Sequence, residues 1–269
     1  MFRYGNPSVR RWVKKSETGA LAIENAGATY RGVIGKTALL IGLTILSAVV
    51  TMLATWYGMF QFAMQEATIS QAAVMGFAIG LGVAVILMLV CAIGIAVAPK
   101  TAKVFGPIYA LIQGAFLGFV AAFLNIILPF VTLAAMLGTA IVFIVCILLY
   151  KKIGVRIKSN FVRVLAISLM CFVLVELIVI PIMLFTPTEG MYTALIWIQT
   201  IATFICIVFA SMTIIWDLQT IDYLVESGAD RKYEWPVAFS LVTSLIYLYM
   251  QILELLLRIF ALFTNSKRK

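Results

Sequence analysis

Long runs of apolar residues alternate with short polar connections over most of the chain. A helix that crosses a membrane needs about 20 predominantly apolar residues. Seven segments reach that length, and they span residues 37–58, 72–98, 107–125, 128–150, 161–185, 193–216 and 236–263. No segment shows the apolar and polar alternation of a strand, and helices satisfy their own backbone groups within a bilayer. The pattern predicts an all-α fold, a polytopic membrane helix bundle.

The connections between these spans differ in their basic residues. Lys and Arg occur before the first span and after the second, fourth and sixth, whereas the connections after the first, third and fifth contain none. Basic loops remain in the cytoplasm, so the N-terminus is predicted to lie there. The domain organisation follows as a basic cytoplasmic segment over 1–36, a seven-helix membrane domain over 37–263 and a basic tail over 264–269.

The last span leaves two topologies open. If 236–263 crosses the membrane, Arg258 and the basic tail lie outside, against the charge rule. A re-entrant or deeply buried last helix would return them to the cytoplasm. Six earlier crossings usually establish the topology first, so seven crossings are predicted.

Composition narrows the class of protein. Of the 269 residues, 64% are hydrophobic and 12% are charged, whereas soluble domains are about half apolar and about a quarter charged. The net charge of +9 resides in short clusters between apolar spans, which indicates membrane topology rather than a nucleic-acid surface. The lipid bilayer is therefore the expected partner, and nucleic acid is not.

Cofactor chemistry has little support in the sequence. Histidine is absent, which excludes imidazole bases and His-ligated metals. The four cysteines each fall inside an apolar span, at no short spacing, so neither a disulfide nor a metal site is predicted. The polar, basic start of the chain is also unlike a cleaved secretory signal.

Three acidic residues lie inside predicted spans or at their ends, where each charge costs about 2.5–3.5 kcal/mol to insert. They are Glu176 in the fifth span, Asp217 at the end of the sixth and Glu254 in the seventh. Gln251, Glu254 and Arg258 are spaced i, i+3 and i+7, which places them on one helix face. That face is the predicted partner of Asp217.

Two carboxyl groups that share a low-dielectric site cannot both ionise at low cost, so one keeps its proton near neutral pH. Such a pair responds to pH, and its oxygen atoms suit hard cations such as Ca²⁺. Our hypothesis is a pH-sensitive carboxyl site on an ion path, formed by Asp217 and Glu254 with Gln251 and Arg258 beside them. Glu176 is a secondary intramembrane acid, and Ca²⁺ would bind only transiently.

Each of these residues also has a structural interpretation. Glu254 and Arg258 can form an i,i+4 ion pair. Asp217 can mark the interfacial end of its helix beside Trp216, and Glu176 can bond a neighbouring helix. The acids that follow Asp217 are typical of a solvated face; they are Asp222, Glu226, Asp230 and Glu234.

Small residues recur at the spacing of close helix packing. Gly114 and Gly118 lie in the third span, and Gly76, Gly80 and Gly82 lie in the second. No strand or basic partner accompanies them, so helix packing is predicted rather than a phosphate-binding loop.

Four stretches resemble a known family. The strongest is IWDLQTIDYLVESGADRKYEWPVAFSLVTSLIYLYMQILELLLR at 215–258. The others are NPSVRRW at 6–12, ATYRGVIGKTALLIGL at 28–43 and, more weakly, PIYALIQGAFLG at 107–118. Together they resemble the Bax inhibitor-1 family, in particular its YccA-like bacterial branch, over essentially all seven spans.

This resemblance implies a bundle in which six helices surround a central last helix. It also implies a pH-dependent calcium leak built on an Asp of the sixth helix and an acid of the last. Asp217 matches the first acid, but the LYMQ run has Gln251 where the second is expected, with Glu254 one turn further. The family's arginine on the second helix has no counterpart, because 72–98 contains no Lys or Arg.

The predicted function is a pH-sensitive cation leak in a bacterial plasma membrane. The resemblance also implies an alternative, a non-transporting regulator that binds other membrane proteins such as a membrane AAA protease. An intramembrane aspartyl protease is disfavoured because no Gly-x-Gly-Asp motif contains Asp217 or Asp222, so no enzyme is predicted.

Overall fold

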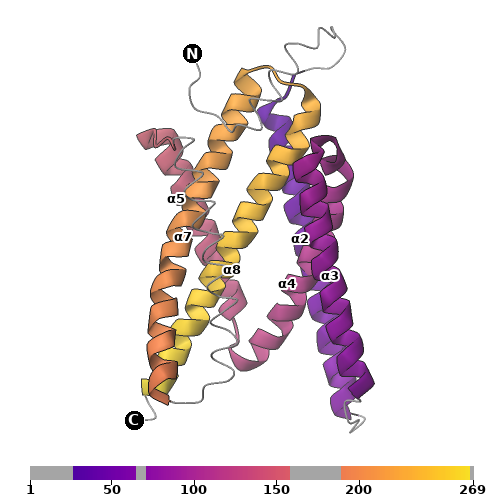
Figure 1. Ribbon diagram of the computed structural model, residues 1–269, viewed down its shortest axis with the longest axis vertical. Helices are drawn as coiled ribbons and strands as arrows, with labels where there is room; N and C mark the ends of the chain where they lie inside the picture. Colours follow the sequence, from indigo (N-terminus) through magenta and orange to yellow (C-terminus); the bar gives the residue numbers. More distant parts are fainter. Residues whose placement is uncertain (1–26, 65–70, 158–188, 267–269) are drawn as a thin grey trace. The chain divides into compact units, whose positions relative to one another are not determined.

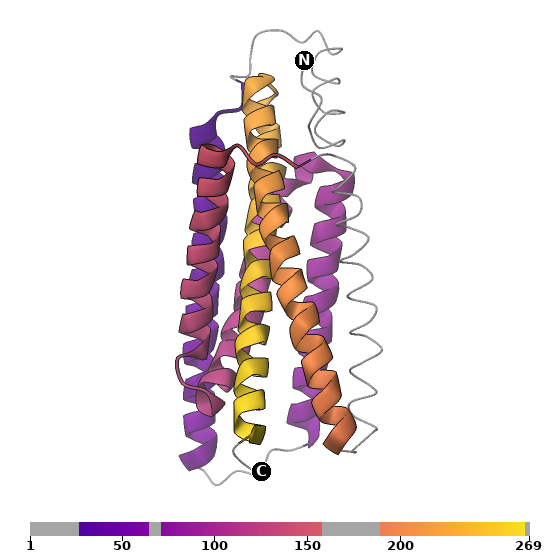
Figure 2. The same cartoon turned by 90° about the vertical axis from the view of Figure 1, so that its left-hand side faces the viewer.

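The structure, a computed structural model, describes residues 27–64, 71–157 and 189–266. Its elements are helices, with one isolated bridge between Gly27 and Asp230, which confirms the all-α class for the described part (Figures 1 and 2). Five of these helices are long and apolar enough to cross a membrane: Tyr30–Gln61, Pro99–Ile127, Val131–Ile153, Ile196–Glu226 and Arg231–Leu262. The predicted span at 161–185 lies outside the described residues.

The helices follow the predicted spans and extend beyond most of them. In chain order the elements are α2 (Tyr30–Met64), α3 (Gln71–Val97), η1 (Pro99–Thr101), α4 (Ala102–Ile127), α5 (Val131–Leu148), the π-helical turn η2 (Leu149–Ile153), α7 (Glu189–Glu226), η3 (Arg231–Tyr233) and α8 (Glu234–Ser266). The spans predicted at 107–125 and 128–150 leave room for only a short connection, and this is confirmed, since α4 ends at Ile127 and α5 begins at Val131.

The largest difference from the sequence prediction concerns α7, which continues ten residues beyond the predicted end at 216. Apolar residues still recur at helical spacing there, and Ile221 and Leu224 are buried. The helix ends where Gly228 adopts a left-handed conformation with φ 63°, a typical end for an α-helix. Asp217 therefore lies within a continuous helix.

The chain divides into two compact units. One contains α2, α3, α4, the loop after α7 and the first residues of α8, up to Val242. In this unit α4 packs against both α2 and α3. The other contains α5, most of α7 and the rest of α8 from Thr243.

Close approach of α4 to α2 depends on small residues. The buried positions of α4 recur every four residues; they are Ala102, Gly106, Ala110, Gly114, Gly118 and Ala122. A Cβ added at Gly114 would lie 2.3 Å from the Thr44 carbonyl oxygen, and one added at Gly118 would lie 2.1 Å from that of Ala48. Ser47 also donates a hydrogen bond to the Leu111 carbonyl, at 2.7 Å. The packing prediction is confirmed for these two glycines.

Among the described residues the same prediction finds no support at Gly80 and Gly82 of α3, since a Cβ added at either would meet none of their atoms within 4 Å. Spacing alone does not show which face of an apolar helix meets another helix. The side chain environment of position 76 lies outside the described residues.

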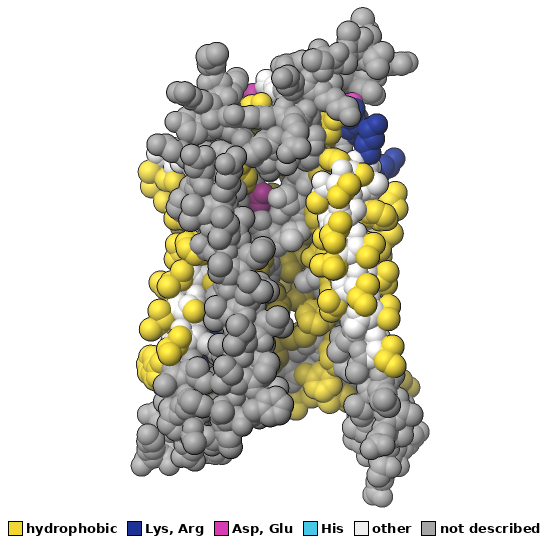
Figure 3. Space-filling view, viewed as in Figure 1, with side chains coloured by type: hydrophobic (Ala, Val, Ile, Leu, Met, Phe, Trp, Pro, Cys, Tyr) yellow, Lys and Arg dark blue, Asp and Glu magenta, His cyan; other side chains and the backbone are white. Residues whose placement is uncertain are grey.

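Large apolar side chains are exposed along the long helices. Examples are Leu53 of α2, Leu89 of α3, Leu137 of α5 and Phe204 of α7. Figure 3 shows apolar side chains spread over the described surface, with Lys and Arg gathered near one end of that face. Soluble monomers rarely expose such continuous apolar surface, so these helices contact lipid in a membrane-embedded protein.

Candidate functional site

Asp217 is a buried acid on α7, with 4% of its surface exposed. The Ser244 hydroxyl of α8 donates a hydrogen bond to its carboxyl oxygen Oδ2, at 2.6 Å. Trp216 is also buried, at 6% exposure. The interpretation of Asp217 as the interfacial end of its helix beside Trp216 is wrong, because both residues are buried and α7 continues to Glu226.

Gln251 lies seven residues after Ser244, about two turns and therefore on the same face of α8. It is buried, and its Oε1 atom has no hydrogen-bond partner among the described residues. The predicted face of α8 thus does turn inward, but the residue that meets Asp217 is Ser244.

Glu254 and Arg258 form the i,i+4 ion pair that the spacing suggested. Arg258 Nε donates to Glu254 Oε1 at 3.1 Å, and its Nη2 contacts the same oxygen. Arg258 Nη1 also donates to the side-chain carbonyl of Gln199 on α7. These contacts form a second polar cluster between α7 and α8, which we call the Arg258 cluster.

The structure does not bring Asp217 and Glu254 together. Ser244, which contacts Asp217, precedes Glu254 by ten residues on α8, a distance of about 15 Å along the helix at ~1.5 Å per residue. A shared-proton pair requires near contact between the two carboxyl groups. The carboxylate-pair hypothesis is therefore wrong for Glu254, and Glu176 lies outside the described residues.

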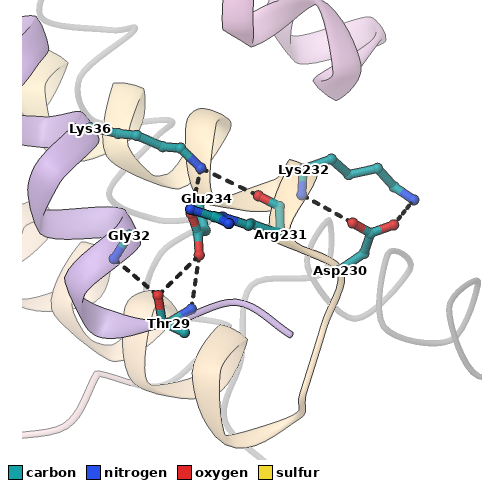
Figure 4. A network of polar contacts seen from close by, with 7 residues as sticks. All are labelled: Thr29, Gly32, Lys36, Asp230, Arg231, Lys232 and Glu234. Atoms are coloured by element: carbon teal, nitrogen blue, oxygen red, sulfur yellow. Dashed lines mark hydrogen bonds and ion pairs between the residues drawn. The ribbon is translucent and has the colours of Figure 1, made fainter. Parts of the chain in front are cut away.

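A different acid, Glu234 at the start of α8, is completely buried. Its Oε1 accepts hydrogen bonds from the Thr29 backbone N–H at 2.9 Å and from the Thr29 hydroxyl at 3.4 Å. Its Oε2 pairs with Lys36 and lies 3.8 Å from Arg231 Nε (Figure 4). The interpretation of this acid as part of a solvated face is wrong.

The Glu234 carboxylate joins two helix N-termini. Thr29 precedes α2 and its hydroxyl accepts a hydrogen bond from the Gly32 N–H at 3.0 Å, the geometry of a helix N-cap. A negative charge is favourable beside the first turn of a helix. The backbone adds a hydrogen bond from Ala28 N to the Ala229 carbonyl, at 2.7 Å. The loop after α7 is thereby attached to the start of α2.

Two more of the acids that follow Asp217 have partners, Asp222 in the last turns of α7 and Asp230 in the loop after it. Asp222 accepts a hydrogen bond from the Tyr150 hydroxyl. Asp230 accepts one from the Lys232 backbone N–H at 3.1 Å and pairs with its ammonium group. Burial alone would raise the pKa of Asp230, but the bonds and charge of Lys232, with the charge of Lys100, hold it below its ordinary value. These contacts of Asp230 stabilise the folded protein at pH values above the ordinary pKa of an aspartate. Their contribution is lost as the pH falls through the lowered pKa of Asp230.

Comparison with known proteins decides the family. A family model described as Bax inhibitor 1 like matches residues 6–261. The chain belongs to the Bax inhibitor 1-like family. No curated protein and no solved structure matched the chain.

In this Bax inhibitor 1-like protein, the described residues contain no group of three or more His, Cys, Asp or Glu side chains that could hold a metal ion. Of the predicted site acids, the structure places Asp217 in a buried position beside a hydroxyl, that of Ser244. Sequence reasoning missed Ser244, although a signal existed: it lies at i−7 from Gln251 and so shares its face. It also missed Glu234, for which the sequence contains no comparable signal.

Proposed function

We propose that this protein is a pH-sensitive cation leak in which Asp217 is the group that binds either a proton or the passing cation. The observation that carries the proposal is the burial of this carboxyl group in an apolar candidate span, bonded to Ser244 of the next one. Ionisable residues inside membrane spans commonly mark ion or proton paths. Membership of the Bax inhibitor 1-like family supports the same proposal.

The pH dependence of cation binding follows from the single carboxyl group of Asp217. In its ionised form it supplies two anionic oxygen atoms, the ligands that hard cations such as Ca²⁺ prefer. The Ser244 hydroxyl orients one of these oxygens and stabilises the charge. A proton and a cation therefore compete for Asp217, and cation flux is expected to fall as the solution becomes acidic.

Flux measurements in reconstituted vesicles test this proposal. Asp217→Asn imitates the protonated acid, so it is expected to reduce Ca²⁺ flux at least about tenfold and to abolish its pH dependence. Ser244→Ala keeps the acid but removes the bond that favours its charge, so the pH at half-maximal flux is expected to rise. Asp230→Asn, at an acid of the loop after α7, is the matched control and leaves flux unchanged.

Flux that Asp217→Asn leaves intact would overturn the proposal. A wild-type protein that carries no cation would instead favour the alternative, a non-transporting regulator that binds other membrane proteins, such as a membrane AAA protease.

We further propose seven crossings in a bacterial plasma membrane, within the YccA-like branch, with a cytoplasmic N-terminus and a central last helix. The basic connections support this orientation. The candidate span Arg231–Leu262 supports a full last crossing, because its 32 residues extend about 48 Å at ~1.5 Å per residue, more than a hydrocarbon core of about 30 Å.

This topology predicts that a reporter fused after Lys269 faces the side opposite to the N-terminus. Paired fusions of alkaline phosphatase, active only outside the cytoplasm, and a fluorescent protein, active inside, would measure this. A fluorescent, phosphatase-negative C-terminus would show that the last segment returns to the cytoplasm.

A further inference from the structure

Two side-chain contacts establish which faces of α7 and α8 meet. Asp217 of α7 bonds Ser244 of α8, and Gln199 of α7 bonds Arg258 of α8. On α7 the two contact residues are eighteen positions apart, which is about five turns, and on α8 they are fourteen apart, about four turns. Each helix therefore presents one continuous face to the other, and the two run antiparallel.

Two further polar side chains lie on these faces, between the two contacts. Thr203 is one turn from Gln199, and Gln251 is seven residues from both Ser244 and Arg258. Thr203 is fully buried and Gln251 is 6% exposed. In the part of the chain that the structure describes, the Thr203 hydroxyl and the Gln251 Oε1 atom have no hydrogen-bond partner. We call these two groups the internal polar site.

Unpaired polar groups are rare in protein interiors because their loss of hydration is uncompensated. Where two occur on facing helix surfaces, water usually bonds them, and a buried water makes about three such bonds. A hydroxyl can donate and accept, and an amide oxygen can accept twice. The internal polar site therefore has the chemistry of a water site rather than of packing.

We propose that Thr203 and Gln251 hold water between α7 and α8, and that this water forms part of the cation route between Asp217 and the Arg258 cluster. The cation route rests on the proposed function, whereas the water site does not. Ile214 and Leu248 are fully buried on the same faces, between Asp217 and the internal polar site. They form an apolar layer that separates the water from Asp217 in this conformation, and apolar constrictions of this kind close ion paths by excluding water.

Radiolytic labelling tests for the water directly. Hydroxyl radicals generated from water by X-rays oxidise nearby side chains, and cysteine is among the most reactive. Cys206 lies three residues from Thr203 and is 3% exposed, whereas Cys146 of α5 is 1% exposed. Cys206 is expected to oxidise several-fold faster than Cys146 in vesicles, and Thr203→Val with Gln251→Leu is expected to remove the difference. Equal rates in the wild-type protein would overturn the water site.

Flux measurements test the route. Thr203→Val and Gln251→Leu are each expected to lower Ca²⁺ flux several-fold. Thr37→Val is the matched control and leaves it unchanged, because Thr37 is a buried, unpartnered threonine on α2. Normal flux in both site variants would overturn the route. Asp217→Asn is expected to reduce flux at least about tenfold while Cys206 oxidation persists. Failure of the proposed function and failure of the water site are thus distinguished.

Discussion

Gly118→Ala is expected to lower the stability of the protein by about 1–3 kcal/mol, near the upper end of that range. An alanine methyl at this position would lie 2.1 Å from the Ala48 carbonyl oxygen and 2.8 Å from its Cα. Both are backbone atoms of α2, which cannot rotate away as a side chain can. The two helices must separate, and the packing along the small-residue face of α4 is lost.

Thermal unfolding in detergent, followed by circular dichroism, measures this effect. Gly42→Ala on α2 is the matched control, because a Cβ there meets no atom of the described residues within 4 Å. The same substitution should then raise stability by up to ~1 kcal/mol, since alanine favours the helical backbone over glycine. Two substitutions of identical chemistry are thus expected to act in opposite directions. Equal shifts would mean that α4 and α2 do not approach as closely as described.

Glu234→Ala is expected to lower stability by about 3–5 kcal/mol, the usual cost of removing one partner from a buried ion pair. Glu234 is fully buried and the Lys36 side chain is 16% exposed. The substitution leaves the Lys36 ammonium group without its carboxylate and the Thr29 N–H without its acceptor. The start of α2 loses both its cap partner and the attachment of the loop after α7.

Thermal unfolding again measures the result, with Asp230→Ala as the control. Asp230 pairs with Lys232 in the same loop, but the side chains are 22% and 40% exposed, so its loss should cost about 1 kcal/mol or less. The double substitution Glu234→Leu with Lys36→Met should recover part of the stability, because neither charge then remains buried alone. If Glu234→Ala cost no more than Asp230→Ala, the buried ion pair would not contribute to stability as we expect.

The elements themselves were largely predictable from local patterns. The apolar runs located every described long helix, and the interval between the predicted spans 107–125 and 128–150 located the connection between α4 and α5. The end of α7 was predicted ten residues early, because the acids after Trp216 interrupt the apolar run although the helical spacing of Ile221 and Leu224 continues. Hydropathy detects the edge of an apolar segment, whereas the helix continues to the left-handed Gly228.

The candidate site was predictable in part. The burial of Asp217 and of Gln251 agrees with the helix face inferred from spacing. The alignment of α7 along α8 was not predictable, and ten residues, nearly three turns, separate the predicted partner Glu254 from the observed partner Ser244. One helical turn is about 5.4 Å, so a small difference in register changes which residues touch.

The amino-acid sequence by itself determined that this is a helical membrane protein, because the free energy of placing a segment in lipid depends on the composition of that segment alone. It also determined which residues share a helix face, since the period of the helix is constant. The tertiary structure alone decided that Asp217 meets Ser244, that Glu254 pairs with Arg258, and that Glu234 is buried against Lys36. Those pairings depend on how separate helices are aligned, and alignment results from packing and loop geometry rather than from any single segment.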